Sequence, residues 1–323
     1  MEGFKNNPLI KKVGFNRIIL ACVLILMYFV FSLGAGRLLN KGDIMNALNM
    51  VDYLGFLALG VTFVIATGGI DFSIGPVMVC SGLIAGRLLV TFGWPLWICL
   101  IVCVIVGMCF GVINGIMVAY MGLPSFISSM ASMMLAKGVG SVFTHVQNSN
   151  WPKSGDPNSW YKYFVSYQGI PTDLIFLVVV AILCAIIMNK TKIGRYILCI
   201  GSNREAVRLS GVDTRKWEML AYIICGTLAG IASITYVGVI TQVQPGLGDE
   251  FNNNAIASCV MGGTSMAGGV ASIGGTFIGV LIISLLRVGI QAMGFRPDYQ
   301  YVITGIIVAL AVFADIRSSA RKK

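Results

Sequence analysis

The sequence predicts an all-α integral membrane protein with about ten transmembrane helices, from its composition, its apolar runs and the placement of its basic residues. Of the 323 residues, 57% are hydrophobic and only 11% are charged, and the mean hydropathy is +0.85. Soluble domains typically carry about 25% charged residues. So few charges cannot cover the surface of a water-soluble protein of this length, and the apolar surface must therefore face lipid.

A helix of about 20 apolar residues crosses the hydrocarbon core of a bilayer. Candidate spans lie at residues 18–36, 46–67, 76–92, 95–120, 125–142, 172–188, 219–240, 254–271, 274–292 and 298–315. The third and the eighth are short or rich in glycine, so we expect each of them to be broken or to enter the membrane only partway. The first follows four basic residues, as a secretory signal does, but it is long and lacks a good cleavage site, so we interpret it as an uncleaved helix.

The Lys and Arg residues predict which helix ends lie in the cytoplasm. With the N-terminus inside, the cytoplasmic segments hold 15 of the 23 basic residues: those before the first span, those between Lys190 and Lys216, and those from Arg317 onward. We therefore expect both termini in the cytoplasm. The net charge of +10 reflects this topology and not nucleic-acid binding, because no basic-aromatic face accompanies it.

Paired glycines interrupt the apolar pattern between the second and the third span, in the run GGIDFSIG from Gly68 to Gly75. Asp71 or Ser73 can accept hydrogen bonds from the free N–H groups of the following helix. Non-helical backbone in a membrane is tolerated only inside protein or beside water. Asp71 therefore either caps a helix or lines a translocation path, and the pattern leaves both open.

The basic segment after the sixth span, residues 189–218, contains a short helix in the run GRYILCIGSNREAVRLSGV, Gly194–Val212. Ser202 and Glu205 form an S-x-x-E capping box, and Gly211 lies where a helix end is expected. A helix this short is not stable alone in water. It either docks against another protein or is a solvated turn held by the membrane domain.

A second glycine-rich run lies between Gln244 and Thr276 and contains MGGTSMAGG and the pair Gly274-Gly275. Glycines in such runs let helices approach closely or break. The run is similar to GGIDFSIG in its glycine pairs and hydroxyl groups. This similarity suggests two related halves, 46–142 and 219–313, within a single transmembrane domain that comprises residues 1–323.

The sequence contains none of the common catalytic or nucleotide-binding motifs. There is no GxxxxGK[ST] phosphate loop, no HExxH, no GxSxG and no carboxylate pair, and the nine cysteines contain no CxxC. The apolar spans also lack the series of carboxylates or histidines that a proton-coupled pump needs. We therefore predict that the chain is not an enzyme and that the energy for transport comes from elsewhere.

Four stretches together resemble the membrane permeases of bacterial ATP-binding-cassette (ABC) importers for simple sugars, the ribose/xylose/arabinose/galactose permease family. They are TGGIDFSIGP at Thr67–Pro76, NGIMVAYMGLPSFI at Asn114–Ile127, GRYILCIGSNREAVRLSGV at Gly194–Val212 and AIASCVMGGTSMAGG at Ala255–Gly269. They occur in the order and spacing of that family, and the resemblance covers nearly the whole chain.

The resemblance implies a vitamin-B12-importer-like permease fold with two inverted-repeat halves, in the bacterial inner (plasma) membrane. It implies a second permease subunit, identical or homologous, a substrate-binding protein that delivers a monosaccharide, and a cytoplasmic ABC ATPase that binds ATP and Mg²⁺. No cofactor is implied in this chain. The short helix would be the helix that couples the ATPase to transport. The positions that match the coupling motif are Glu205, Ala206, Arg208, Leu209, Ser210 and Gly211.

Polar side chains in or beside the apolar spans are candidates for the translocation path: Asp71, Ser73, Asn114, Ser129 and Asn254. Each has helix capping or a helix–helix hydrogen bond as its alternative role. One departure from the family concerns the run before Ala255. Members often carry a Glu and an Asp there, whereas this chain has EFNNNAIA, with Asn252 and Asn254 at those places. Because of that difference, the resemblance does not assign the family's site residues to this run.

Three other functions fit parts of the pattern. A secondary transporter or channel for a small polar solute would work without an ATPase. An integral membrane enzyme would need clustered carboxylates or histidines at one membrane face, which the sequence lacks. A permease of the same family for another small molecule, such as a furanose-like signal, would share every motif described above.

Overall fold

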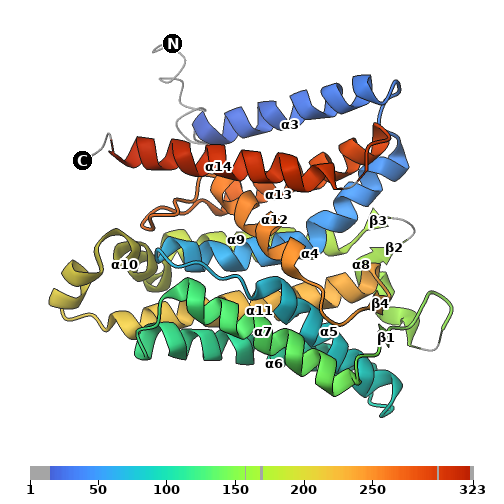
Figure 1. The fold of residues 1–323 in the computed structure, drawn as a ribbon, viewed down its shortest axis with the longest axis horizontal. Helices are drawn as coiled ribbons and strands as arrows, with labels where there is room; N and C mark the ends of the chain where they lie inside the picture. Colours follow the sequence, from blue (N-terminus) through green and yellow to red (C-terminus); the bar gives the residue numbers. More distant parts are fainter. Residues whose placement is uncertain (1–14, 157, 168–169, 297, 321–323) are drawn as a thin grey trace.

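Long apolar helices lie side by side in the structure, a computed structural model that describes residues 15–156, 158–167, 170–296 and 298–320 (Figure 1). The main helices are α3 (Phe15–Gly34), α4 (Lys41–Ala66), α5 (Ile74–Val90), α6 (Leu96–Gly115), α7 (Ser125–Thr144), α9 (Asp173–Lys190), α10 (Lys192–Leu209), α11 (Thr214–Val239), α12 (Asp249–Met261), α13 (Ile273–Ala292) and α14 (Tyr299–Ala320). A π-helical turn, η1 (Ile116–Tyr120), continues α6.

The helices run along one axis, and different elements cluster at its two ends (Figure 1). Helix α10 lies at one end, together with the start of α3 and the last turns of α14. The opposite end carries η2 (Ser159–Tyr161), α8 (Lys162–Val165) and the short strands β1 (Ser149–Asn150), β2 (Ser166–Tyr167), β3 (Ile170–Pro171) and β4 (Gln242–Val243). Both strand pairs are antiparallel, with Ser149 opposite Val243 and Ser166 opposite Pro171. We call these the α10 end and the strand end.

Six helices of the described chain are long and apolar enough to cross a membrane. They are Lys41–Ala66, Leu96–Tyr120, Ser125–Thr144, Asp173–Lys190, Thr214–Val239 and Ile273–Ala292. Shorter apolar helices cover Ile18–Gly34 and Ile74–Val90. The predicted all-α membrane protein is therefore confirmed. The span at 254–271, which we expect to be broken or to enter the membrane only partway, is interrupted, because α12 ends at Met261 and a chain of turns leads from there to α13.

The core of the bundle is α4, which is buried at every residue from Met50 to Ala66. Helices α9, α11, α12 and α13 all pack against it. The outer helices α6, α7 and α9 keep apolar side chains exposed on their far faces, as helices that contact lipid do. Burial therefore increases from lipid-facing helices inward to α4.

Two G-x-x-x-G runs form the contact between α6 and α11. Gly107 and Gly111 of α6 face Gly226 and Gly230 of α11, so the two backbones touch. A Cβ atom on Gly107 would lie 2.4 Å from the carbonyl oxygen of Gly226. Small residues that permit backbone contact are typical of helix pairs in membranes, where close packing replaces the hydrophobic effect as the driving force.

Aromatic residues seal the loop between α7 and α9 onto the strand end. Trp151 and Tyr161 are 2% and 1% exposed, and the Trp151 ring nitrogen donates to the Gly82 carbonyl at 3.1 Å. The Tyr161 hydroxyl donates to the carbonyl groups of Pro152 and Val237, both at 3.3 Å. Their hydrogen bonds go to the protein backbone, so these two rings hold the loop on the bundle.

We predict that Gly107→Ala destabilises the protein by about 1–3 kcal/mol, because the added methyl group overpacks a backbone contact. Gly138→Ala is the matched control, since a Cβ atom on Gly138 of α7 meets no atom within 4 Å. That control should leave stability unchanged or raise it slightly. Thermal unfolding in detergent, followed with a thiol-reactive dye, measures both, and equal effects would contradict the role of this contact.

Candidate functional site

The helix break between α4 and α5 is held by a small buried network. Asp71 Oδ1 accepts hydrogen bonds from the Ser73 backbone N–H at 2.8 Å and from the Ser73 hydroxyl at 2.6 Å. Asn114 of α6 donates to Ser73 Oγ at 2.8 Å. The three side chains are 1–2% exposed. Asp71 therefore accepts the N–H of Ser73, the residue before α5, and the Ser73 side chain makes no capping hydrogen bond to α5. Ser73 links Asp71 to α6.

A residue outside the predicted set, Asn252 of α12, completes this network. Its Oδ1 accepts the Gly75 N–H at 2.7 Å, and its Nδ2 donates to the Phe72 carbonyl. One amide thus satisfies a free donor and a free acceptor of the broken backbone. The sequence marked position 252 only as a departure from the family pattern. The residue type was the available clue, because an amide can donate and accept while a carboxylate only accepts.

The remaining path candidates lie in two different places. Ser129 Oγ is within hydrogen-bond distance of the Phe126 and Ile70 carbonyls, at 3.1 and 3.3 Å, so Ser129 belongs to the break. Asn254 is 3% exposed, and its Nδ2 makes no hydrogen bond to the described residues. The structure thus brings Asp71, Ser73, Asn114 and Ser129 to the break, while Asn254 has no hydrogen bond to them.

The two glycine-rich runs meet α10 at a single contact. Gly269 N–H donates to the Ala66 carbonyl at 3.0 Å, and Gly201 of α10 packs against both. A Cβ atom on Gly201 would lie 2.0 Å from the Ala66 oxygen and 2.4 Å from the Gly269 nitrogen. Gly268, with φ of +82°, contacts Gly68 and Gly201. We call Ala66, Gly68, Gly201, Gly268 and Gly269 the glycine junction.

The short helix follows directly from this junction. Asn203 has non-helical φ and ψ of −158° and 95°, so α10 bends there and a new helix begins. Asn203 Oδ1 accepts the Ala206 N–H at 3.0 Å. The predicted capping box of Ser202 and Glu205 is therefore wrong, because the cap is one residue later and Glu205 pairs with another residue. Gly211, with φ of +82°, ends the helix as predicted.

The short helix projects from the bundle and is attached mainly at its base. Arg204 forms a two-pronged ion pair with Glu218 of α11 at 2.6 and 3.1 Å. Beyond Arg204, Glu205, Ala206, Arg208, Leu209 and Ser210 are all exposed, and Leu209 keeps 75% of its surface accessible. An exposed leucine on a helix of so few residues indicates a contact surface, because the helix gains little from its own domain.

Charge on the short helix is neutralised locally. Arg208 donates to both Glu205 carboxylate oxygens at 2.6 and 3.0 Å. This hydrogen bonding lowers the pKa of Glu205 and raises that of Arg208. The pair is fully exposed, so it fixes the two side chains on one face and adds little stability.

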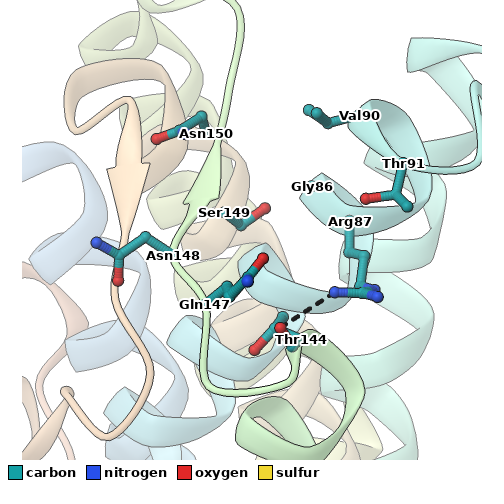
Figure 2. Close-up of a pocket in the computed structure, with 9 residues that line it drawn as sticks. All are labelled: Gly86, Arg87, Val90, Thr91, Thr144, Gln147, Asn148, Ser149 and Asn150. Atoms are coloured by element: carbon teal, nitrogen blue, oxygen red, sulfur yellow. Dashed lines mark hydrogen bonds between the residues drawn. The ribbon is translucent and has the colours of Figure 1, made fainter.

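A polar pocket of about 190 Å³ opens at the strand end (Figure 2). It is lined by Gly86, Arg87, Val90, Thr91, Thr144, Gln147, Asn148, Ser149 and Asn150. Arg87 of α5 donates to the Thr144 carbonyl at 3.1 Å, as the dashed line in Figure 2 shows. Its hydroxyl, amide and guanidinium groups suit a small polar molecule, and the sequence did not single this pocket out.

A broken helix with a buried polar network and an exposed helix at the same end of an apolar bundle are features of a transport protein. The family model for "Branched-chain amino acid transport system / permease component" matches residues 44–312. The chain belongs to this family of transport permeases. It is therefore a membrane component of a transport system and not an enzyme.

Individual relatives cover almost the whole chain. The ribose import permease protein RbsC of Escherichia coli (strain K12) is 31% identical over 298 residues, which are 92% of each protein. RbsC of Bacillus subtilis (strain 168) is 32% identical over 303 residues, again 92% of each. The xylose transport system permease protein XylH of Haemophilus influenzae (strain ATCC 51907 / DSM 11121 / KW20 / Rd) is 29% identical over 364 residues, 95% of this chain and 96% of that protein. No solved structure matches the chain.

We predict that Asn252→Ala destabilises the protein by about 1–3 kcal/mol, because it leaves the Gly75 N–H and the Phe72 carbonyl buried without partners. Asn254→Ala is the matched control for stability, since the Asn254 Nδ2 makes no hydrogen bond in the described chain. Thermal unfolding of both variants in detergent provides the measurement. An equal or larger loss for Asn254→Ala would show that the Asn252 bridge contributes little.

Proposed function

We propose that the chain is the transmembrane permease subunit of an ABC importer for a monosaccharide. The family membership and the ribose and xylose permeases among its relatives support the substrate class. The observation that carries the proposal is the exposed helix 203–210, which projects from the bundle beside the glycine junction. A secondary transporter or channel has no use for such a surface, whereas an importer driven by a separate ATPase needs one.

The full fold in this proposal has about ten membrane crossings of the vitamin-B12-importer type, with both termini in the cytoplasm. The shared end of α3, α10 and α14 in Figure 1 and the distribution of basic residues support this orientation. The helix lengths support two inverted-repeat halves, 46–142 and 219–313, because each half opens with a helix of 26 residues, α4 or α11, followed by a break. The membrane is the bacterial inner membrane.

Glu205, Ala206, Arg208, Leu209, Ser210 and Gly211 form the ATPase-coupling surface in this proposal. ATP and Mg²⁺ bind to the partner ATPase, and this chain carries no cofactor of its own. When the ATPase closes, it pushes on helix 203–210. Because Gly201 touches both Ala66 and Gly269, that motion reaches the end of α4 and the turns between α12 and α13 without an intervening side chain.

The translocation path then lies beside the helix break, with Asp71, Ser73, Asn114 and Ser129 around it and Asn254 on α12. A second permease subunit, identical or homologous, closes the other side of the path, and a substrate-binding protein delivers the sugar to the strand end. Alternating access follows when the hydrogen bonds of the break open and close with the motion of α10.

We predict that Leu209→Asp reduces co-purification of the partner ATPase at least about tenfold, because a charge replaces an apolar contact at the centre of the interface. Glu205→Arg should have the same effect by reversing the charge of the surface. Leu38→Asp is the matched control, since Leu38 is 69% exposed in the loop between α3 and α4, at the strand end.

The measurement is tagged purification of the chain with its neighbouring-gene products in detergent, together with size-exclusion chromatography to verify folding. Loss of the ATPase in both helix variants and its retention with Leu38→Asp is the expected outcome. If wild type captures no ATPase, or the helix variants capture it equally well, the ABC assignment fails and a transporter that works alone becomes the better description.

We also predict that proteoliposomes with the complete complex take up labelled ribose or xylose in an ATP-dependent manner. Competition by an excess of each unlabelled pentose and hexose ranks the substrates. Branched-chain amino acids are the control competitors, because the family description names them. Inhibition by an amino acid and by none of the sugars would refute the substrate class and leave the permease role intact.

A further inference from the structure

A half-buried arginine lies in the polar pocket at the strand end. Arg87 is in the last turn of α5, and it forms no salt bridge with the residues that the structure describes. Its Nη1 donates to the Thr144 carbonyl at 3.1 Å, and the same carbonyl accepts the Gln147 N–H at 3.1 Å. The side chain is therefore held against the end of α7. A guanidinium group has five N–H donors and always keeps its charge, so most donors and the whole charge of Arg87 remain for a ligand.

A second polar group of the pocket is buried without a partner. Ser149 of β1 is 5% exposed, and its hydroxyl oxygen makes no hydrogen bond to the described residues. It lies directly on the backbone of α5, because a Cβ atom on Gly86 would be 2.1 Å from the Ser149 oxygen. The nearby Trp151 ring nitrogen donates to the Gly82 carbonyl instead. Buried hydroxyl groups are normally hydrogen-bonded, so this one indicates a partner from outside the chain.

The wall of the pocket opposite α5, residues 147–150, is held in place by the rest of the fold. Strand β1 pairs with β4, and the Trp151 N–H donates to the Thr241 carbonyl at 2.7 Å. Just before this wall, His145 and Val146 have positive φ angles of 51° and 61°. Residues other than glycine seldom adopt such angles, and strained backbone of this kind is concentrated at functional sites. A wall that is already ordered lowers the entropic cost of binding a ligand.

Polar groups surround the space in front of α5 (Figure 2). Thr91, Gln147 and Ser149 direct their polar ends into the space between α5 and the wall 147–150. The described lining residues include no Asp or Glu, so the Arg87 guanidinium is the only charged group among them. A half-buried positive charge favours a ligand with one negative charge, because an excess of either sign in the pocket is costly. A carboxylate meets this condition, and its two oxygens match the parallel N–H groups of a guanidinium, whereas a phosphate dianion would leave excess negative charge.

We propose that this pocket binds a small hydroxy acid, with the carboxylate on Arg87 and the hydroxyl group between Ser149, Gln147 and Thr91. The volume of about 190 Å³ corresponds to roughly six water molecules at their liquid volume of about 30 Å³ each, which is enough for a molecule of the size of lactate. The bound acid joins α5 to β1, and β1 is paired with β4 between α11 and α12. The site is separate from the helix break and does not depend on which solute the protein transports.

Matched variants separate the charge from the hydroxyl group. Arg87→Gln removes the charge and the paired donors. Ser149→Ala removes only the hydroxyl group, and because that group has no partner without ligand, the ligand-free protein should not lose stability. Arg296→Gln is the control for charge, because the Arg296 side chain is 81% exposed, is paired with Asp298 and does not line the pocket.

The binding of lactate to the purified full chain in detergent is measured by calorimetric titration at constant ionic strength, with thermal unfolding as the second readout. Lactamide is the matched probe, since it keeps the shape and the hydroxyl group of lactate but has no charge. We expect lactate to bind the wild type and Arg296→Gln and to raise their unfolding midpoints by several degrees. Lactamide should bind at least about tenfold more weakly, and Arg87→Gln should bind lactate at least about tenfold more weakly than wild type. Ser149→Ala should lose lactate affinity several-fold while its ligand-free midpoint does not fall.

Several outcomes of these titrations would overturn the proposal. They are the absence of lactate binding to wild type, equal affinities for lactate and lactamide, and equal lactate affinities of Arg87→Gln and Arg296→Gln. Tighter binding of inorganic phosphate than of lactate would overturn the carboxylate as the ligand class. If Arg87→Gln does not fold, Ser149→Ala decides: a lower ligand-free midpoint with unchanged lactate affinity would show that Ser149 is only structural and would refute the site.

Discussion

The contact of three backbone segments at the glycine junction is the constraint on which the rest of the structure depends. The end of α4, the middle of α10 and the turns before α13 approach so closely that even one Cβ atom on Gly201 would overlap the Ala66 carbonyl. Larger side chains at this place would hold the three segments apart and let them move relative to one another. Their absence makes the junction a rigid connection between the surface helix 203–210 and both interruptions of the membrane helices. The same device, backbone against backbone at glycines, holds α6 to α11 along the bundle.

Breaking helices inside a membrane requires that each free backbone group finds a partner. This chain meets the requirement with few side chains: Asp71 takes one donor, Asn252 takes a donor and an acceptor, and Ser73 connects them to Asn114. The bonds of Asn252 and of Asn114 link the break to the neighbouring helices α12 and α6. The break is thus stable only while α6 and α12 remain in place, which makes it suited to open and close as those helices move.

Polar and charged groups divide into two kinds by their surroundings. Exposed pairs such as Glu205 with Arg208 neutralise each other on a solvent-facing surface and leave the helix free for a partner. Buried groups must be satisfied within the protein, as Asn252 shows with an amide that bonds both a donor and an acceptor of the break.

The sequence by itself determined the class of protein, most helix positions and the places of the helix break and of the short surface helix, because apolar run length, glycine pairs and basic loops are local properties. It also determined where the short helix ends, since Gly211 alone can take the left-handed backbone at that point at no cost. Local pattern misplaced the start of that helix by one residue, because either Ser202 or Asn203 could cap it and only the packing of Gly201 at the junction selects Asn203. The bond between Asn114 and Ser73 and the bridge made by Asn252 were decided by tertiary structure alone. Each of these contacts joins helices distant in the chain, and nothing in a single sequence states which faces of those helices will touch.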